Sequence, residues 1–145
     1  MTLESLGVGS CLVALCLMVG LAHAQGTVRT IEKGAQSNVD DALKASARTD
    51  AEWAALWKKH NGAKPAPKID FSKEMVVAVF MGSRPTAGFA VEIVSAAERN
   101  GKLVVSYRET LPGPGTVSAQ VLTAPYHLAA VPRTGSEVAF EKVND

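Results

Sequence analysis

The chain has few of the residues from which metal, redox or nucleophilic sites are usually built. Its only two cysteines, Cys11 and Cys16, lie in an apolar N-terminal segment, and a chain without that segment has no disulfide, thiolate metal site or cysteine nucleophile. Neither His60 nor His127 stands in a metal-binding spacing such as H-E-x-x-H, and the G-x-S-x-G motif of serine hydrolases is absent. We therefore expect no catalytic residue, no metal ligand and no cofactor.

An excess of charge of either sign is also missing. Fifteen lysines and arginines face fourteen aspartates and glutamates, which gives a formal net charge of +1. Proteins that bind nucleic acid or anionic membrane surfaces usually carry a strong basic excess. We therefore expect a protein partner and no nucleic acid, while the oligomeric state stays open.

The N-terminus has the features of a signal peptide. Residues 12–21 form an apolar run too short to span a membrane, and Ala22, His23 and Ala24 form an A-x-A cleavage motif. The first ten residues depart from the usual pattern because they contain no lysine or arginine. We expect residues 1–24 to be removed on export to the periplasm or the medium. Residues 25–145 then form a single domain without a membrane span.

The most apolar part of the remaining chain is residues 75–81, an unbroken run of strand length. Such a run is typical of a strand that is covered on both faces, and its valines favour a strand over a helix. Residues 89–94 alternate between two faces, as in a half-buried strand. Because a Gly/Pro turn joins the two stretches, they predict a central β-hairpin.

One amphipathic helix is predicted before this hairpin. Thr49 and Glu52 form a capping box, in which each side chain accepts a hydrogen bond from the other residue's backbone N–H. Apolar and aromatic residues then recur at 53, 56, 57 and 60, and Asn61 with Gly62 ends the helix. This spacing predicts a helix that packs on a sheet through both tryptophans.

Further short strands complete the predicted fold. Asn100 and Gly101 are a strong hairpin signal, because both residues of a type I′ turn need positive φ. Other strands are predicted at residues 27–32, 42–47, 102–108, 117–122, 127–131 and 137–142. The fold class is therefore mainly β (α+β), an antiparallel β-sandwich or a partly open barrel with one helix packed on it.

Four motifs together resemble the protease-complex subunit PrcB C-terminal domain family of small exported bacterial proteins. They are V-A-V-F-M-G at 77–82, R-P-T-A-G-F at 84–89, P-G-P-G at 112–115 and T-A-P-Y-H-L at 123–128. Where the family usually has Gly-Gly, this chain has Ala87 and Gly88. The resemblance, strongest over residues 75–133, implies a non-catalytic module that associates with an exported protease or envelope protein and stabilises it.

Two of these motifs lie in turns and form the candidate partner-contact site. Loops on a rigid β-scaffold often carry binding residues, although turn residues are also explained by the backbone alone. The alternatives are a protease inhibitor acting through the 84–89 and 112–115 loops, by a faint similarity to chagasin-type inhibitors, and an uncharacterised hydrolase. The candidate contact residues are Arg84, Pro85, Thr86, Phe89, Pro112, Gly113, Pro114 and Gly115.

Overall fold

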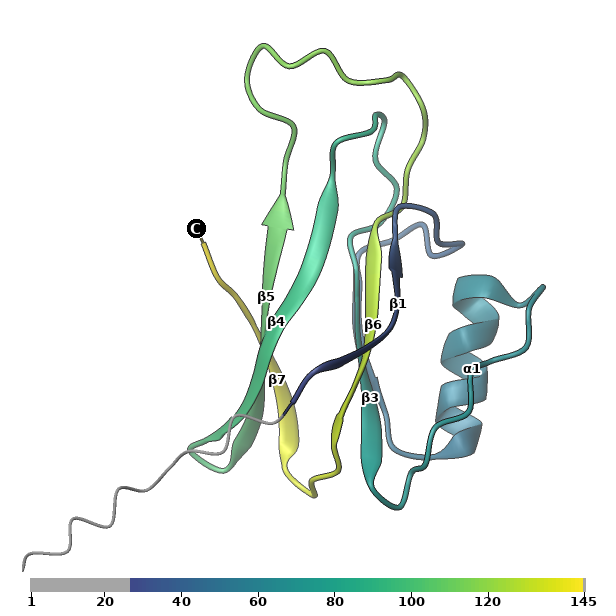
Figure 1. Ribbon diagram of the computed structural model, residues 1–145, viewed down its shortest axis with the longest axis vertical. Helices are drawn as coiled ribbons and strands as arrows, with labels where there is room; N and C mark the ends of the chain where they lie inside the picture. Colours follow the sequence, from purple (N-terminus) through teal and green to yellow (C-terminus); the bar gives the residue numbers. More distant parts are fainter. Residues whose placement is uncertain (1–26, 145) are drawn as a thin grey trace, which may run out of the picture.

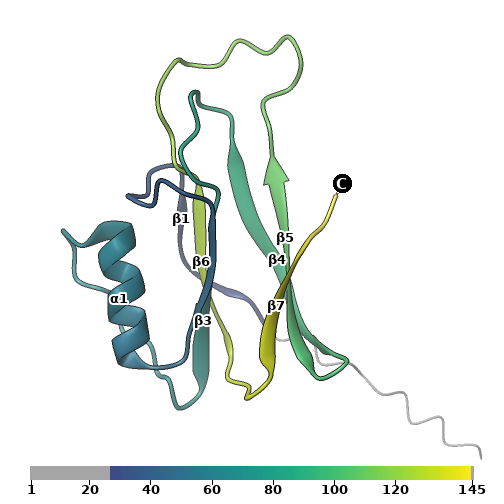
Figure 2. The same cartoon turned by 180° about the vertical axis from the view of Figure 1, so that it is seen from behind.

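The computed structural model describes residues 27–144, so the predicted signal peptide lies outside the described residues. Two β-sheets face each other, and one helix covers the outer face of the larger sheet (Figure 1). Figure 2 shows the same three layers from behind. The prediction of a mainly β fold with one packed helix is confirmed. In spatial order the larger sheet contains β1 (Arg29–Gly34), β6 (Tyr126–Pro132), β3 (Glu74–Phe80) and β2 (Leu43–Ala47), and the smaller sheet contains β4 (Ala90–Arg99), β5 (Lys102–Thr110) and β7 (Glu137–Lys142).

Strand β3 lies at the centre of the larger sheet and is buried on both faces. Val76 and Phe80 point to the layer of the helix α1 (Asp50–Asn61), where they pack with Trp57. Val77 and Val79 point the other way, into the core between the two sheets. Because successive side chains of a strand alternate between faces, a strand covered on both faces has to be apolar throughout.

The predicted central hairpin is wrong, because β3 and β4 lie in different sheets. Strand β3 already has a neighbour on each side, β2 and β6, which use the hydrogen-bonding groups along both of its edges. Residues 81–89 therefore cross from one sheet to the other, and we call them the crossing loop. Strand β4 pairs with β5 through the predicted turn, in which φ is 52° at Asn100 and 76° at Gly101.

The pairing of β7 also departs from the antiparallel prediction. Strand β7 runs parallel to β5, with Leu103 opposite Val138. The chain reaches β7 from β6 in the other sheet, so no tight hairpin turn imposes an antiparallel direction. The smaller sheet is therefore mixed, and the two sheets form an open sandwich.

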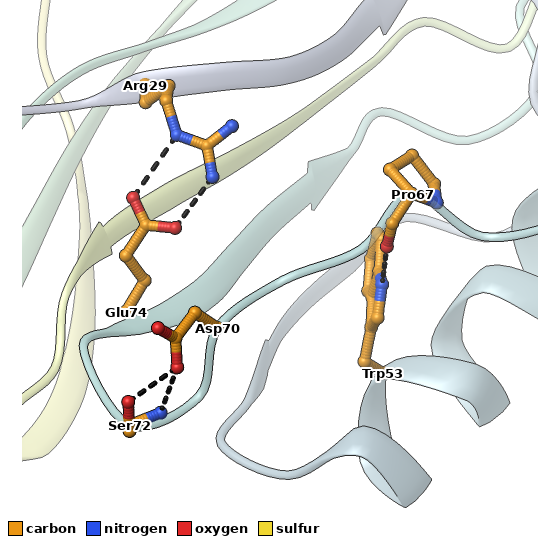
Figure 3. Close-up of polar contacts among 6 residues, drawn as sticks. All are labelled: Arg29, Trp53, Pro67, Asp70, Ser72 and Glu74. Carbon is orange, nitrogen blue, oxygen red and sulfur yellow. Dashed lines mark hydrogen bonds and ion pairs between the residues drawn. The ribbon is translucent and has the colours of Figure 1, made fainter.

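Helix α1 begins at the predicted cap, although only half of the predicted capping box forms. The Thr49 hydroxyl accepts a hydrogen bond from the Glu52 N–H at 3.2 Å, but the Glu52 carboxylate accepts from the Arg48 N–H at 3.0 Å instead of the Thr49 N–H. The Trp53 indole N–H donates to the Pro67 carbonyl at 2.9 Å, as Figure 3 shows. This bond fixes the helix to the connection that leads into β3. No helix among residues 27–144 is long and apolar enough to cross a membrane.

Figure 3 also shows two polar contacts at the start of β3. The Arg29 guanidinium and the Glu74 carboxylate form an ion pair with a shortest N–O distance of 2.6 Å. The Asp70 carboxylate accepts hydrogen bonds from both the backbone N–H and the hydroxyl of Ser72, a local turn interaction typical of aspartate. Both contacts lie at the end of the sandwich opposite the crossing loop (Figure 1).

Candidate partner-binding site

The two predicted contact loops come together at one end of the sandwich. The crossing loop joins β3 to β4, and residues 111–125, which we call the long loop, arch from β5 to β6 above it (Figure 1). Each loop connects the two sheets, so their ends are fixed by strands of both layers. We call this part of the molecule the loop end.

Backbone hydrogen bonds hold the two loops against each other. The Arg84 N–H donates to the Thr123 carbonyl at 2.7 Å, and the Thr123 N–H donates back to the Arg84 carbonyl at 2.9 Å. The Ala87 N–H donates to the Ala119 carbonyl at 3.0 Å. The Thr123 hydroxyl also donates to the Thr86 carbonyl at 2.9 Å. The long loop is thus attached to the crossing loop at two separate points.

Gly88 lies at a close approach between the crossing loop and the long loop. Its φ is +97°, a value that side chains of L-residues rarely allow. A Cβ atom placed on Gly88 would lie 3.0 Å from Cγ of Pro112 and 3.2 Å from Oγ of Ser118. Both the backbone conformation and the space therefore require glycine, as expected from the turn motif.

The loop end carries most of the exposed aliphatic surface of the described residues. Of the five large hydrophobic side chains that are exposed among residues 27–144, four lie on the long loop, and the fifth is Val94 on β4. No aspartate, glutamate, lysine or arginine occurs between positions 111 and 132. Large apolar side chains that are exposed together on one segment are candidates for an interaction site. The four side chains, with their exposed fractions, are Leu111 (60%), Val117 (99%), Val121 (50%) and Leu122 (76%).

The strand predicted at residues 117–122 is wrong. Val117 and Val121 alternate there with polar residues as in a half-buried strand, but both side chains face solvent and the segment has no regular secondary structure. Both sheets are complete without this segment. Its backbone carbonyls accept hydrogen bonds from Ala87 of the crossing loop, from the Gln36 side chain and from Val121 within the segment itself. The sequence prediction therefore missed the aliphatic side chains of the site, because their spacing is also that of a strand.

Arg84 is a positively charged residue at the contact between the loops, where its backbone bonds to Thr123. Its guanidinium carbon lies 5.6 Å from the ring centroid of Phe89, a cation–π geometry. Its Nε atom is buried and has no hydrogen-bond partner in the described chain. A charged turn residue is expected to be fully exposed, but Arg84 is half-buried against an aromatic ring.

The remaining predicted contact residues form the outer part of the loop end. Pro85 is exposed on the crossing loop, and Gly113, Pro114 and Gly115 are exposed at the tip of the long loop. A turn closes this tip, since the Thr116 N–H donates to the Gly113 carbonyl at 3.1 Å. All eight predicted residues thus lie at the same end of the molecule.

The two histidines of the described chain are both buried, one in each core. His127 lies between the sheets, where its Nδ1 accepts from the Ile93 N–H at 2.7 Å and its Nε2 lies 2.9 Å from the Thr30 hydroxyl. Because Nδ1 is an acceptor, the proton of the neutral ring is on Nε2, which donates to Thr30. Burial lowers the pKa of His127 to about 4, so the ring is neutral at pH 7.

His60 lies on the buried face of α1, where it belongs to a polar cluster between the helix and the larger sheet. Its Nδ1 lies 2.8 Å from the Ser37 hydroxyl, and its Nε2 lies 3.6 Å from the Glu32 carboxylate. The Tyr126 hydroxyl donates to the same carboxylate at 2.7 Å. Burial lowers the pKa of His60 and, together with the Glu32 hydrogen bond, raises the pKa of Tyr126. Within residues 27–144, no three His, Cys, Asp or Glu side chains form a group that could hold a metal ion.

Comparison with known protein families gives one match. Residues 75–132 match the family described as PrcB C-terminal. The matched segment runs from β3 to β6 and contains both loops, whereas α1 and β7 lie outside it. Comparisons with curated proteins and with solved structures found no significant match. Over residues 75–132 the chain thus matches the PrcB C-terminal family, which confirms the resemblance seen in its motifs.

Proposed function

We propose that this protein is an exported, non-catalytic protein-binding module whose loop end contacts an exported protease or an envelope protein and stabilises it. The observation that carries the proposal is the gathering of four exposed aliphatic side chains on one uncharged loop. The family match adds a protease-complex context and contains both loops. Export is part of the proposal and rests on the N-terminal sequence features.

The loop end has two properties that favour binding. Its aliphatic side chains are already exposed, so burying them against a partner removes apolar surface from water. Its backbone is held by the bonds at Arg84, Ala87 and Thr123, so little conformational freedom remains to be lost on binding. An exposed and pre-organised apolar surface is more costly to keep in solution than a polar one, which supports a role in recognition.

A second function, direct inhibition of a protease, is favoured by the shape of the loop end. The two loops protrude together from a rigid sandwich (Figure 1), as a wedge that enters an enzyme cleft would have to do. The same residues would serve either function. The two proposals differ in whether the partner's activity falls or is maintained when the domain binds.

Capture from the exported fraction of cells that make the protein tests the first proposal. The test variant is Val121→Asp, and the matched control is Val94→Asp, because both replace an exposed valine with the same charge. We expect wild type and Val94→Asp to retain the same partner and Val121→Asp to lose it. Equal capture by all three proteins would contradict a role for the long loop.

A further inference from the structure

Val117 and its neighbours have the properties of a peptide ligand held ready for binding. The Val117 side chain is 99% exposed, and neither its N–H nor its carbonyl is hydrogen-bonded to any described residue. The chain is constrained on both sides of it, by a local turn at the tip of the long loop on one side and by the crossing loop on the other. The Thr116 N–H is bonded to Gly113, and the Ala119 carbonyl is bonded to Ala87.

Clefts that bind extended peptides recognise unpaired main-chain groups and exposed side chains. Main-chain hydrogen bonds to the cleft supply affinity, and pockets for individual side chains supply specificity. A free N–H, a free carbonyl and a fully exposed side chain at one residue fit such a cleft. Because the flanking residues are already fixed, little conformational entropy is lost when the segment docks.

The side chains limit the kind of cleft that fits. Val117 is a small branched aliphatic residue, and Thr116, Ser118 and Ala119 beside it are small and uncharged. An apolar pocket of small size at the primary specificity position is the elastase type of serine endopeptidase pocket, whereas a trypsin-type pocket contains an aspartate. The long loop contains no lysine or arginine that could pair with such an aspartate, so it does not fit a trypsin-type pocket.

We propose that residues 116–119 occupy the substrate cleft of an elastase-type serine endopeptidase, with Val117 in the primary specificity pocket, and so inhibit it. This inference rests on the second proposed function, direct inhibition of a protease, and names the surface of the partner that the long loop contacts. The binding residue is Val117, and the crossing loop positions it through Ala87 and Gly88.

Inhibition, and not ordinary cleavage, follows from how the segment is held. The enzyme's serine hydroxyl adds to the Val117 carbonyl carbon, and its proton passes through the enzyme's histidine to the Ser118 nitrogen as the Val117–Ser118 bond breaks. Ser118 packs against Gly88, and Ala119 is bonded to Ala87, so the new amine stays beside the acyl-enzyme. Held in place, this amine re-forms the peptide bond faster than water releases the acyl group.

The test measures inhibition of pancreatic elastase and trypsin by the purified domain, residues 25–145, with chromogenic peptide substrates. We expect wild type to inhibit elastase and to have little effect on trypsin. Val117→Arg should weaken elastase inhibition by at least about thirty-fold, as loss of a central buried anchor does, and should create trypsin inhibition. Val94→Arg is the matched control for the added charge and should behave as wild type.

Three outcomes would overturn the inference. They are no elastase inhibition at a large molar excess of the domain, rapid cleavage after Val117 without inhibition, and inhibition that is the same for wild type and Val117→Arg. Thermal melts of each variant distinguish lost inhibition from lost folding. Val117→Arg should melt at the same temperature as wild type, since Val117 is fully exposed. If capture still depends on Val121 in any of these cases, the proposed partner binding stands and only the protease cleft is wrong.

Discussion

Replacing Gly88 with valine tests whether the two loops are held together as the structure shows. The substitution places a β-branched side chain at a φ of +97°, which costs about 1–3 kcal/mol in backbone strain. It also places Cβ 3.0 Å from Cγ of Pro112, an atom of a rigid ring. Crowding of this kind typically adds about 1–3 kcal/mol. Together the two terms predict that the free energy of unfolding falls by about 2–6 kcal/mol.

The control for this prediction is Gly115→Val on the long loop. Gly115 also has a positive φ, +76°, but a Cβ there would meet no atom within 4 Å. Its substitution carries the backbone strain without the contact. Urea unfolding of the domain gives both values, and Gly88→Val should also lower the melting temperature by roughly 4 °C per kcal/mol for a domain of this size. If Gly88→Val is no more destabilising than Gly115→Val, the contact with Pro112 does not hold the loops.

Three further predictions concern pH, the loop-end arginine and processing. The pKa of His127 is about 4 in the folded protein and 6.5 ordinarily, so below pH 6.5 the unfolded chain binds a proton that the folded protein excludes. The contribution of His127 to the free energy of unfolding is complete above pH 6.5 and falls by about 3 kcal/mol as the pH drops to 4. The free energy of unfolding in urea should therefore depend less on pH for His127→Gln than for wild type. Arg84→Ala should lower the free energy of unfolding by about 0.5–2 kcal/mol, the range of a cation–π contact from exposed to desolvated, and weaken partner binding by about 1–2 kcal/mol. Melts and titrations separate the two effects, and a larger loss of stability would make Arg84 a structural residue. Intact-mass analysis of exported protein should give a chain that begins at Gln25, and a retained N-terminus would contradict the export proposal.

Local signals predicted individual elements of the fold well. The apolar run of β3, the Asn100–Gly101 turn and the aromatic face of α1 each depend on residues close together in sequence. The pairing of strands could not be predicted in the same way. Whether β3 pairs with β4 or with β6 depends on which edges remain free in the assembled sheet, and the parallel partner of β7 depends on the path between sheets.

The candidate site was predicted in part, through its turn residues. Motifs that contain Pro85, Gly88 and Pro112 pointed to two loops, and the strands that fix the loop ends bring them together. The exposure of Val117 and Leu122 could not be predicted, because an alternating aliphatic segment is usually a half-buried strand. Only the completed sheets show that this segment has no strand to pair with.

Site-specific photo-crosslinking tests the role of the loop end most directly. A benzophenone amino acid is placed at position 122 on the long loop or at position 94 on β4, in cells that export the protein, and is activated by light. Leu122 and Val94 are both exposed aliphatic residues, but only Leu122 lies on the proposed contact surface. We predict a discrete crosslinked partner from position 122 and none from position 94. A partner that crosslinks from position 94 and not from position 122 would contradict binding through the loop end.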